Sequence, residues 1–224
     1  MKSIEEISTD FGELKTITLS DGSIVKLNAN SILKFNQDWQ KGEEREIWLE
    51  GEAYFNVIHT KQNTPFKVYA NGMEVRVLGT EFNVYGRENM AKVVLEEGAI
   101  KLKTSSSQQS LRLEPGDMVT FNTKNLDLRK DRVDTRLHTS WKDRKLVFSK
   151  TSLMKLSDIM KENFDLDFFF IDANLAKKEF TGVIPSDNKD ILIQSLSEAF
   201  NIDVEVRGKT VILRSKSDEK SKYQ

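Results

Sequence analysis

Residues 46–57 read Glu-Ile-Trp-Leu-Glu-Gly-Glu-Ala-Tyr-Phe-Asn-Val, two short runs of mostly alternating residues on either side of Gly51. Such alternation predicts strands with one buried face, because successive side chains of a strand point to opposite sides. Similar runs recur from residue 15 to residue 128, at a spacing of about ten residues that is typical of sandwiches, barrels and solenoids. The sequence therefore predicts a large all-β domain around this stretch.

Turn signals divide the strand runs. Asp21-Gly22 and Asn71-Gly72 lie between apolar runs and predict hairpins, because these residues tolerate positive φ. Glu97-Gly98 repeats the pattern weakly, so a β-solenoid-like stack is favoured, with a sandwich-like domain as the alternative. Residues 104–110 are interpreted as a flexible loop and residues 111–121 as a last hairpin.

The period changes near Trp141. Strand-like runs then alternate with two helix-like runs, for which Thr151 or Ser152, and later Asp187 or Asn188, are candidate N-caps. Residues 163–168 align with residues 199–204, so a duplicated strand–helix–strand unit is expected. We predict an all-β domain at residues 14–128, a charged connector at 129–140, a small α/β domain at 141–214 and a polar tail at 215–224.

Composition excludes several classes of protein. The formal net charge of −1 argues against binding to nucleic acid, and the absence of Cys excludes thiolate metal sites. His59 and His138 are the only histidines, too few for the usual metal site on strands, and we expect both at the surface. We expect no cofactor, and no run is long enough to span a membrane.

One pair of carboxylates is a candidate catalytic site. Glu50 and Glu52 lie two apart on the predicted strand and so should face the same side, as glycoside hydrolysis would require. A structural role is favoured instead, with Gly51 allowing a bulge or a special φ. We therefore predict no catalytic residue and a protein that is not an enzyme.

Several of these stretches together resemble the extracytoplasmic region of FecR-type anti-sigma regulators of the Bacteroidetes form. The likeness spans roughly residues 14–214, and the α/β part is similar to a short secretin/TonB N-terminal (STN-like) signalling domain. The resemblance is carried by residues 19–31, 45–57, 65–68, 75–84, 95–98, 113–117, 141–148 and 180–182.

The resemblance implies a function in transcription regulation by cell-surface signalling. Such a regulator crosses the inner membrane once, and its periplasmic part receives a signal from the signalling domain of a TonB-dependent outer-membrane transporter. Its cytoplasmic segment holds an ECF sigma factor. Neither that segment nor a membrane helix is present here, so we expect a periplasmic piece of a longer protein that does not bind the sigma factor by itself.

Binding to the transporter is expected at the α/β domain. Its strands offer edges for strand addition, and Thr210–Leu213 and its hairpin partner Ile202–Val206 are the candidate edge. The candidate partner-binding residues are Phe169, Ile202, Val204, Val206, Thr210 and Ile212. The alternative is a β-rich glycan-binding or glycan-cleaving envelope protein, which would show Trp39, Trp48 or Trp141 in an open groove beside Glu50.

Overall fold

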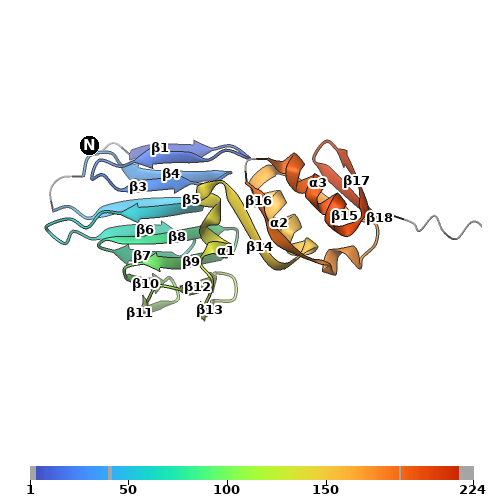
Figure 1. Cartoon of the computed structure of the whole chain (residues 1–224). Coiled ribbons are helices and arrows are strands. Elements are labelled where there is room, and N and C mark those ends of the chain that lie inside the picture. The colour runs from blue at the N-terminus through green and yellow to red at the C-terminus, as the bar shows by residue number, and fades with distance from the viewer. Residues whose placement is uncertain (1–3, 40–41, 187, 217–224) are drawn as a thin grey trace, which may run out of the picture. The chain divides into compact units, whose positions relative to one another are not determined.

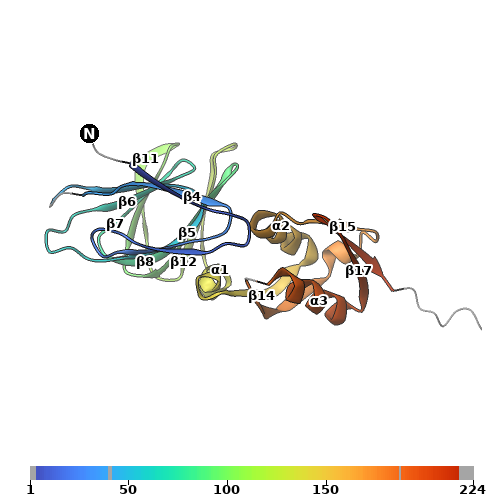
Figure 2. The same ribbon diagram turned by 90° about the horizontal axis from the view of Figure 1, so that it is seen from above.

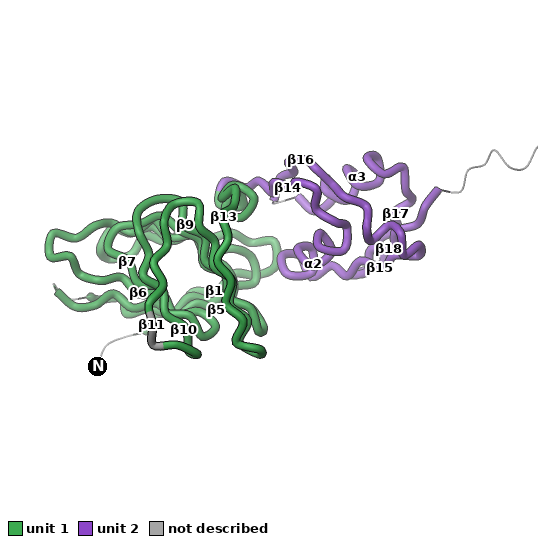
Figure 3. The backbone as a smooth tube through the Cα atoms, turned by 90° about the horizontal axis from the view of Figure 1, so that it is seen from below, with its two compact units in different colours: residues 1–142 green, residues 143–224 purple. Residues whose placement is uncertain are grey.

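The computed structural model describes residues 4–39, 42–186 and 188–216 and divides the chain into two compact units, residues 1–142 and 143–224 (Figure 3). Unit 1 is built almost entirely of strands, and unit 2 combines strands with two longer helices (Figure 1). A mainly β chain with a small α/β part was predicted, and this prediction is confirmed.

Unit 1 contains a single sheet of thirteen strands in its described residues, followed by two short helical turns. The elements are β1 (Ile4–Thr9), β2 (Lys15–Thr18), β3 (Ile24–Leu27), β4 (Ser31–Asn36), β5 (Arg45–Val57), β6 (Phe66–Ala70), β7 (Met73–Val77), β8 (Thr80–Arg87), β9 (Met90–Glu97), β10 (Ile100–Thr104), β11 (Ser107–Leu113), β12 (Asp117–Asn122), β13 (Asp127–Arg132), α1 (Arg136–Thr139) and η1 (Ser140–Asp143).

The long strand β5 belongs to both layers of this sheet (Figure 2). Its first half pairs with β4 and β6 in a first layer that runs β1-β4-β5-β6-β7-β10-β11. Its second half pairs with β3 and β8 in a second layer that runs β2-β3-β5-β8-β9-β12-β13. The strand crosses between the layers at Gly51, whose φ of +106° confirms the special conformation predicted there.

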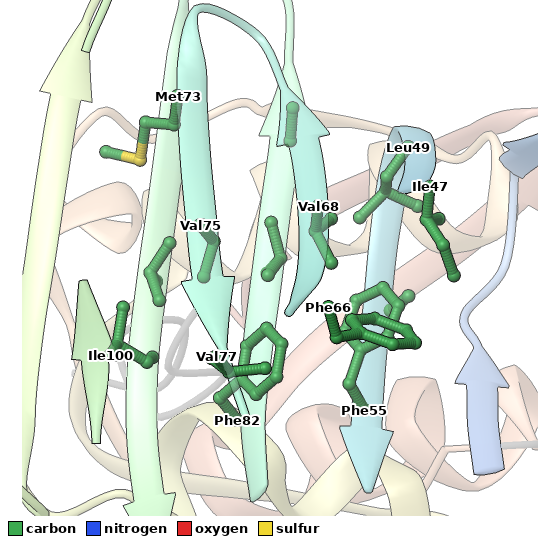
Figure 4. Packing of buried hydrophobic residues seen from close by; sticks show 14 of the residues in the cluster. Ile47, Leu49, Phe55, Phe66, Val68, Met73, Val75, Val77, Phe82 and Ile100 are labelled. Atoms are coloured by element: carbon green, nitrogen blue, oxygen red, sulfur yellow. The ribbon is translucent and has the colours of Figure 1, made fainter. Parts of the chain in front are cut away.

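The two layers enclose one apolar core (Figure 4). Phe55 lies at its centre, stacked on Phe82 with ring centroids 5.1 Å apart and edge-on to Phe66 at 6.0 Å. All three side chains are fully buried, and such aromatic pairs contribute about 0.5–1.5 kcal/mol beyond their burial. These three Phe residues of the alternating runs are therefore core residues, as their period predicts.

The structure decides between the two forms predicted for the all-β domain. Neighbouring strands in the described part of unit 1 are antiparallel except β5 and β6, whereas a solenoid stacks parallel strands. The sandwich-like form is therefore correct. The hairpin predictions at Asp21-Gly22 and Asn71-Gly72 are confirmed by β2–β3 and β6–β7, but Glu97-Gly98 joins strands of different layers.

Two segments predicted as irregular contain strands. The prediction of a flexible loop at residues 104–110 is wrong, because this segment enters β11, which pairs with β10. The prediction of a hairpin at residues 111–121 is also wrong, because β11 and β12 lie in different layers. Residues 129–132 of the predicted connector belong to β13, which pairs with β12 along its whole length. Alternation was missed there because β13 is an exposed edge strand with hardly any apolar residue.

Unit 2 has its own core and two separate sheets. One sheet pairs β14 with β16, and the other has the order β15-β18-β17. The elements are β14 (Lys145–Ser152), α2 (Leu153–Phe164), β15 (Asp167–Phe170), η2 (Leu175–Lys177), β16 (Glu179–Pro185), α3 (Lys189–Phe200), β17 (Ile202–Arg207) and β18 (Thr210–Ser215).

The order β14–α2–β15 followed by β16–α3–β17 is the duplicated unit that the sequence predicts. The first strands of the two repeats pair with each other, and the second strands are joined through β18. Ser152 and Asn188 cap the helices by accepting backbone N–H groups, and the aligned residues Asp165 and Asn201 end them at φ values of +55° and +49°. Asp187 and most of the predicted tail lie outside the described residues.

Candidate functional site

The three-stranded sheet of unit 2 contains all six residues predicted to bind a partner. On its outer face, Phe169 is in register with Ile212, which lies opposite Glu205 of β17. Phe169 is 58% exposed, although its neighbours Phe168 and Phe170 pack against the core. An exposed aromatic side chain beside an aliphatic one on a sheet face is a typical anchor for a protein contact. Thr210 belongs to the same outer face, at the end of β18.

The other three predicted residues point toward the helices. Ile202 is 1% exposed and belongs to the core of unit 2, so its side chain cannot contact a partner. Val204 packs against the same core, and Val206, farther along β17, is half exposed. The six residues therefore share one sheet but not one face.

The predicted edge is wrong in one respect. Thr210–Leu213 belongs to β18, which pairs with β17 on one side and with β15 on the other, so it is the central strand. The hairpin partner β17 is an edge of this sheet, and β15 is the opposite edge. Sequence reasoning missed this because the parallel pairing of β15 with β18 joins segments about forty residues apart and leaves no local signal.

Exposed ion pairs surround the turn at one end of this sheet. Arg207 is 2.6 Å from Glu205, and Asp165 accepts from both Lys161 and Lys209. Hydrogen bonds from the two lysines hold the pKa of Asp165 below its ordinary value. These exposed pairs contribute little to stability, but they give this end of the sheet a rim of alternating charge.

The two carboxylates of the candidate catalytic pair lie on different layers. Glu50 is opposite Ile32 on the first layer, whereas Glu52 is opposite Tyr85 on the second. Burial raises the pKa of Glu52, although the side-chain amides of Asn83 and Asn28 donate to it at 2.8 and 2.7 Å. Because the strand bends at Gly51, the expectation that both face one side of a flat strand does not hold.

The tryptophans lie in three different environments. Trp141 is buried, and Trp39 is partly buried against Phe35 and Phe66. Trp48 is 42% exposed and lines an open groove of about 540 Å³ together with Glu50. This last arrangement is the one that the glycan-binding alternative requires.

A polar network fastens the end of unit 1 to the second layer. Glu96 accepts hydrogen bonds from Tyr54, Thr139 and Lys142, and the Lys142 ammonium lies 3.9 Å from the centre of the Tyr54 ring. Burial would by itself raise the pKa of Glu96, but these three donors together lower it below its ordinary value. Sequence reasoning missed the network, because its members are more than forty residues apart.

The described residues were also compared with what a metal site or a membrane span requires. His59 is exposed, as predicted, and His138 is partly buried. In the described ranges, no group of three or more acidic or histidine side chains is placed to hold a metal ion. None of the helices in the described part of the chain has the length and apolar character that a membrane span requires.

Comparison with known proteins agrees with the division into two units. The profile of the family described as FecR protein matches residues 5–101, and that described as FecR, C-terminal, matches residues 145–213. No curated protein matches the chain. Two crystal structures of a candidate anti-sigma factor from Parabacteroides distasonis ATCC 8503, at 2.50 and 1.65 Å resolution, share the fold with a TM-score of 0.77. Each is 24% identical in sequence to this chain, and the alignments cover 96% and 95% of this chain and the full length of the crystallised chains.

Proposed function

Because this chain belongs to the FecR family, we propose that it is the periplasmic sensor region of an anti-sigma regulator that receives a signal from a TonB-dependent outer-membrane transporter. Two family profiles match separate parts of the chain, one in each unit. The aligned crystal structures extend over nearly its full length and are described as those of a candidate anti-sigma factor. The role is regulatory rather than enzymatic, and control of an ECF sigma factor would be exerted through a cytoplasmic segment of the whole regulator.

We assign the transporter-binding role to unit 2, and the exposed edge of β17 carries that assignment. Asp203, Glu205, Val206 and Arg207 are all exposed, so the backbone of this strand is accessible along most of its length. A partner strand can add to such an edge through backbone hydrogen bonds, while neighbouring side chains give specificity. Phe169 and Ile212 supply an apolar contact on the outer face of the same sheet.

Unit 1 has a relaying role in this proposal. Its last helical turns, α1 and η1, lead directly into β14 of unit 2 and are held on the second layer by the hydrogen bonds of Thr139 and Lys142 to Glu96. A force on the chain at residue 143 would therefore act first on this attachment. We therefore place the relaying β domain within residues 4–142 and the transporter-binding domain within residues 143–216.

The hairpin geometry provides a sharp test. Arg207 and Thr210 close a two-residue turn with Gly208 at positive φ, so they form a hydrogen-bonded pair. Because such pairs alternate, the N–H of Val206 points away from β18 toward the open edge. Val206→Pro removes that donor without breaking a bond inside the hairpin, whereas Val206→Ala trims the side chain and keeps the donor.

Binding is measured by calorimetry against the signalling domain of the transporter encoded beside this protein. We expect micromolar affinity, since transient signalling interfaces often bury about 1,200 Å² or less. Val206→Pro should weaken binding at least about tenfold, and Val206→Ala should leave it nearly unchanged. The same experiment is repeated with a second FecR-type protein and the transporter signalling domain encoded beside it. Absence of binding in both pairs at about 100 μM would refute the proposed partner. Equal effects of the two variants would refute strand addition at this edge.

A further inference from the structure

The open groove of unit 1 lies on the outer surface of the first layer, away from the core. Side chains from six neighbouring strands form one row on this surface, because each is in register with the next, and all but the first line the groove. In strand order they are Glu6, Lys34, Trp48, Tyr69, Glu74 and Lys103. Adjacent strands are about 4.8 Å apart, so the row forms a continuous surface rather than isolated contacts.

Two aromatic rings form the centre of the row. The rings of Trp48 and Tyr69 stack with their centroids 5.7 Å apart and an angle of 21° between their planes. The Tyr69 hydroxyl donates to Glu46 at 2.9 Å, and partial burial together with this bond raises the pKa of Tyr69. The ring is therefore fixed by a phenol that stays protonated, and Trp48 is left 42% exposed beside it.

Two turns bound the groove at one end. The side-chain amide of Asn71 donates to the backbone oxygens of Arg87, Glu88 and Met90 at 3.4, 3.0 and 3.0 Å. The N–H of Ser105 donates to the Gly72 oxygen at 2.8 Å, which joins the second turn to the first. These bonds are made within the protein, so this end of the groove is formed before any ligand arrives.

Charges around the aromatic pair balance one another. Lys34 and Lys103 supply two positive charges, and Glu50 and Glu74 supply two negative charges. Lys34 is held 2.8 Å from Glu6, whose hydrogen bond raises the pKa of the lysine. A strongly charged ligand would meet a like charge wherever it lay, whereas a neutral ligand with many hydroxyl groups could pair with donors and acceptors of both kinds.

The geometry points to a neutral oligosaccharide of pyranose sugars as the ligand of this groove. A pyranose ring has one face of C–H groups, whose partly positive hydrogens are attracted to the negative face of an aromatic ring. Its hydroxyl groups would reach the ammonium and carboxylate groups beside Trp48. The volume of about 540 Å³ is in the usual range for small-molecule sites. This inference is independent of the proposed binding of a transporter at unit 2.

Cross-strand stabilisation of the sheet is the competing explanation for the aromatic pair. An aromatic pair of this kind stabilises a sheet by about 0.2–1 kcal/mol, and that role needs no ligand. The two explanations differ in what Trp48→Ala changes. A purely structural pair predicts a small loss of stability only, and a sugar platform predicts a loss of binding that exceeds it.

The probes are maltohexaose, cellohexaose, laminarihexaose and N-acetylchitohexaose as neutral oligosaccharides, with hyaluronate hexasaccharide as the anionic comparison. Saturation-transfer NMR and calorimetry on the whole chain should show saturable binding of at least one neutral probe, with Kd of about 1 mM or tighter. Trp48→Ala should weaken it about 30-fold, as for a binding hot spot. Trp48→Phe should restore part of the affinity. Arg76→Ala, on the same outer face but outside the groove, is the matched control.

Four results would overturn the inference. The first is that no neutral probe binds at about 10 mM, and the second is that Trp48→Ala binds sugar as well as the wild type does. The third is that only hyaluronate binds. The fourth is that no sugar binds and Trp48→Ala loses binding to the transporter domain. The last would assign the groove to a protein partner. Val206→Pro should leave sugar binding unchanged, so this test fails or succeeds separately from the test at β17.

Discussion

At the scale of single residues, Arg45 and Gly51 both stabilise the fold of unit 1, but the sequence reveals only one of them. Arg45 is 2% exposed, pairs with Asp21 and donates to the Thr64 oxygen at 2.8 Å. Its guanidinium also lies 5.1 Å from the centre of the Phe66 ring. In the sequence, Arg45 simply precedes an alternating run, and nothing local distinguishes it from an exposed charge. Gly51 is different, because its place between two runs predicts an unusual backbone.

Gly51→Ala is expected to destabilise unit 1 strongly. A Cβ on Gly51 would lie 2.2 Å from the Ser31 Oγ and 2.7 Å from its Cα, at a φ of +106° that non-glycine residues rarely adopt. We expect a loss of more than about 3 kcal/mol in the free energy of unfolding, measured by urea titration with tryptophan fluorescence.

Gly42→Ala is the control for that substitution. Its φ is +90°, but a Cβ there would meet nothing within 4 Å, so only the backbone strain of about 1–2 kcal/mol is expected. Similar losses in the two variants would show that close packing of Ser31 against Gly51 is not what fixes the bend of β5.

At the scale of elements, the sequence predicts strands and helices well and their partners less well. The α/β order, the helix caps Ser152 and Asn188 and the hairpins at Asp-Gly and Asn-Gly follow from local signals, and the structure confirms them. The two-layer arrangement of unit 1 and the central place of β18 depend on pairing between distant segments. The six candidate partner-binding residues accordingly lie on one sheet but on two faces of it, and the strand predicted as its edge, β18, is the central strand.

The attachment of α1 and η1 to the second layer is an element-scale contact that can be tested. Glu96→Gln replaces the charged acceptor of three hydrogen bonds, each of which contributes about 1.5–3 kcal/mol when one partner is charged. We expect faster amide hydrogen exchange at His138 and Thr139, whose N–H groups bond to the Thr135 oxygen. The exposed neighbour Glu97→Gln should have no such effect.

The same attachment should depend on pH in a definite direction. The pKa of Glu96 is lowered in the folded protein, so its contribution is present above the ordinary value of 4.5 and is lost as the pH falls through the lowered pKa. Protection of these two amides, corrected for intrinsic exchange, should therefore fall below about pH 4.5 in the wild type. Persistence of full protection at pH 3, or the same pH dependence in Glu96→Gln, would exclude Glu96 as the group responsible.

At the scale of the whole molecule, the described residues form two hydrophobic cores, one in each unit, that share no residue. The core of unit 1 lies between the two layers of its sheet, and that of unit 2 gathers residues from α2, α3 and both small sheets. Parts of a protein with separate cores can open locally while the rest stays folded, and elements that move in regulation are drawn from the less stable parts. Whether the cores unfold separately is therefore a functional question as well as a structural one.

Matched substitutions can show whether the two cores unfold separately. Leu33 and Leu196 are suitable because both are almost fully buried, one in each core. Each Leu→Ala change should cost about 2–5 kcal/mol in its own unit. Calorimetry of the whole chain should show two transitions, with Leu33→Ala lowering the Tm of one and Leu196→Ala lowering the Tm of the other. If each substitution instead shifts both transitions equally, or if a single transition responds to both, the chain unfolds as one cooperative body. In that case, a partner bound at β17 would act on the stability of the whole chain rather than through the attachment at Glu96.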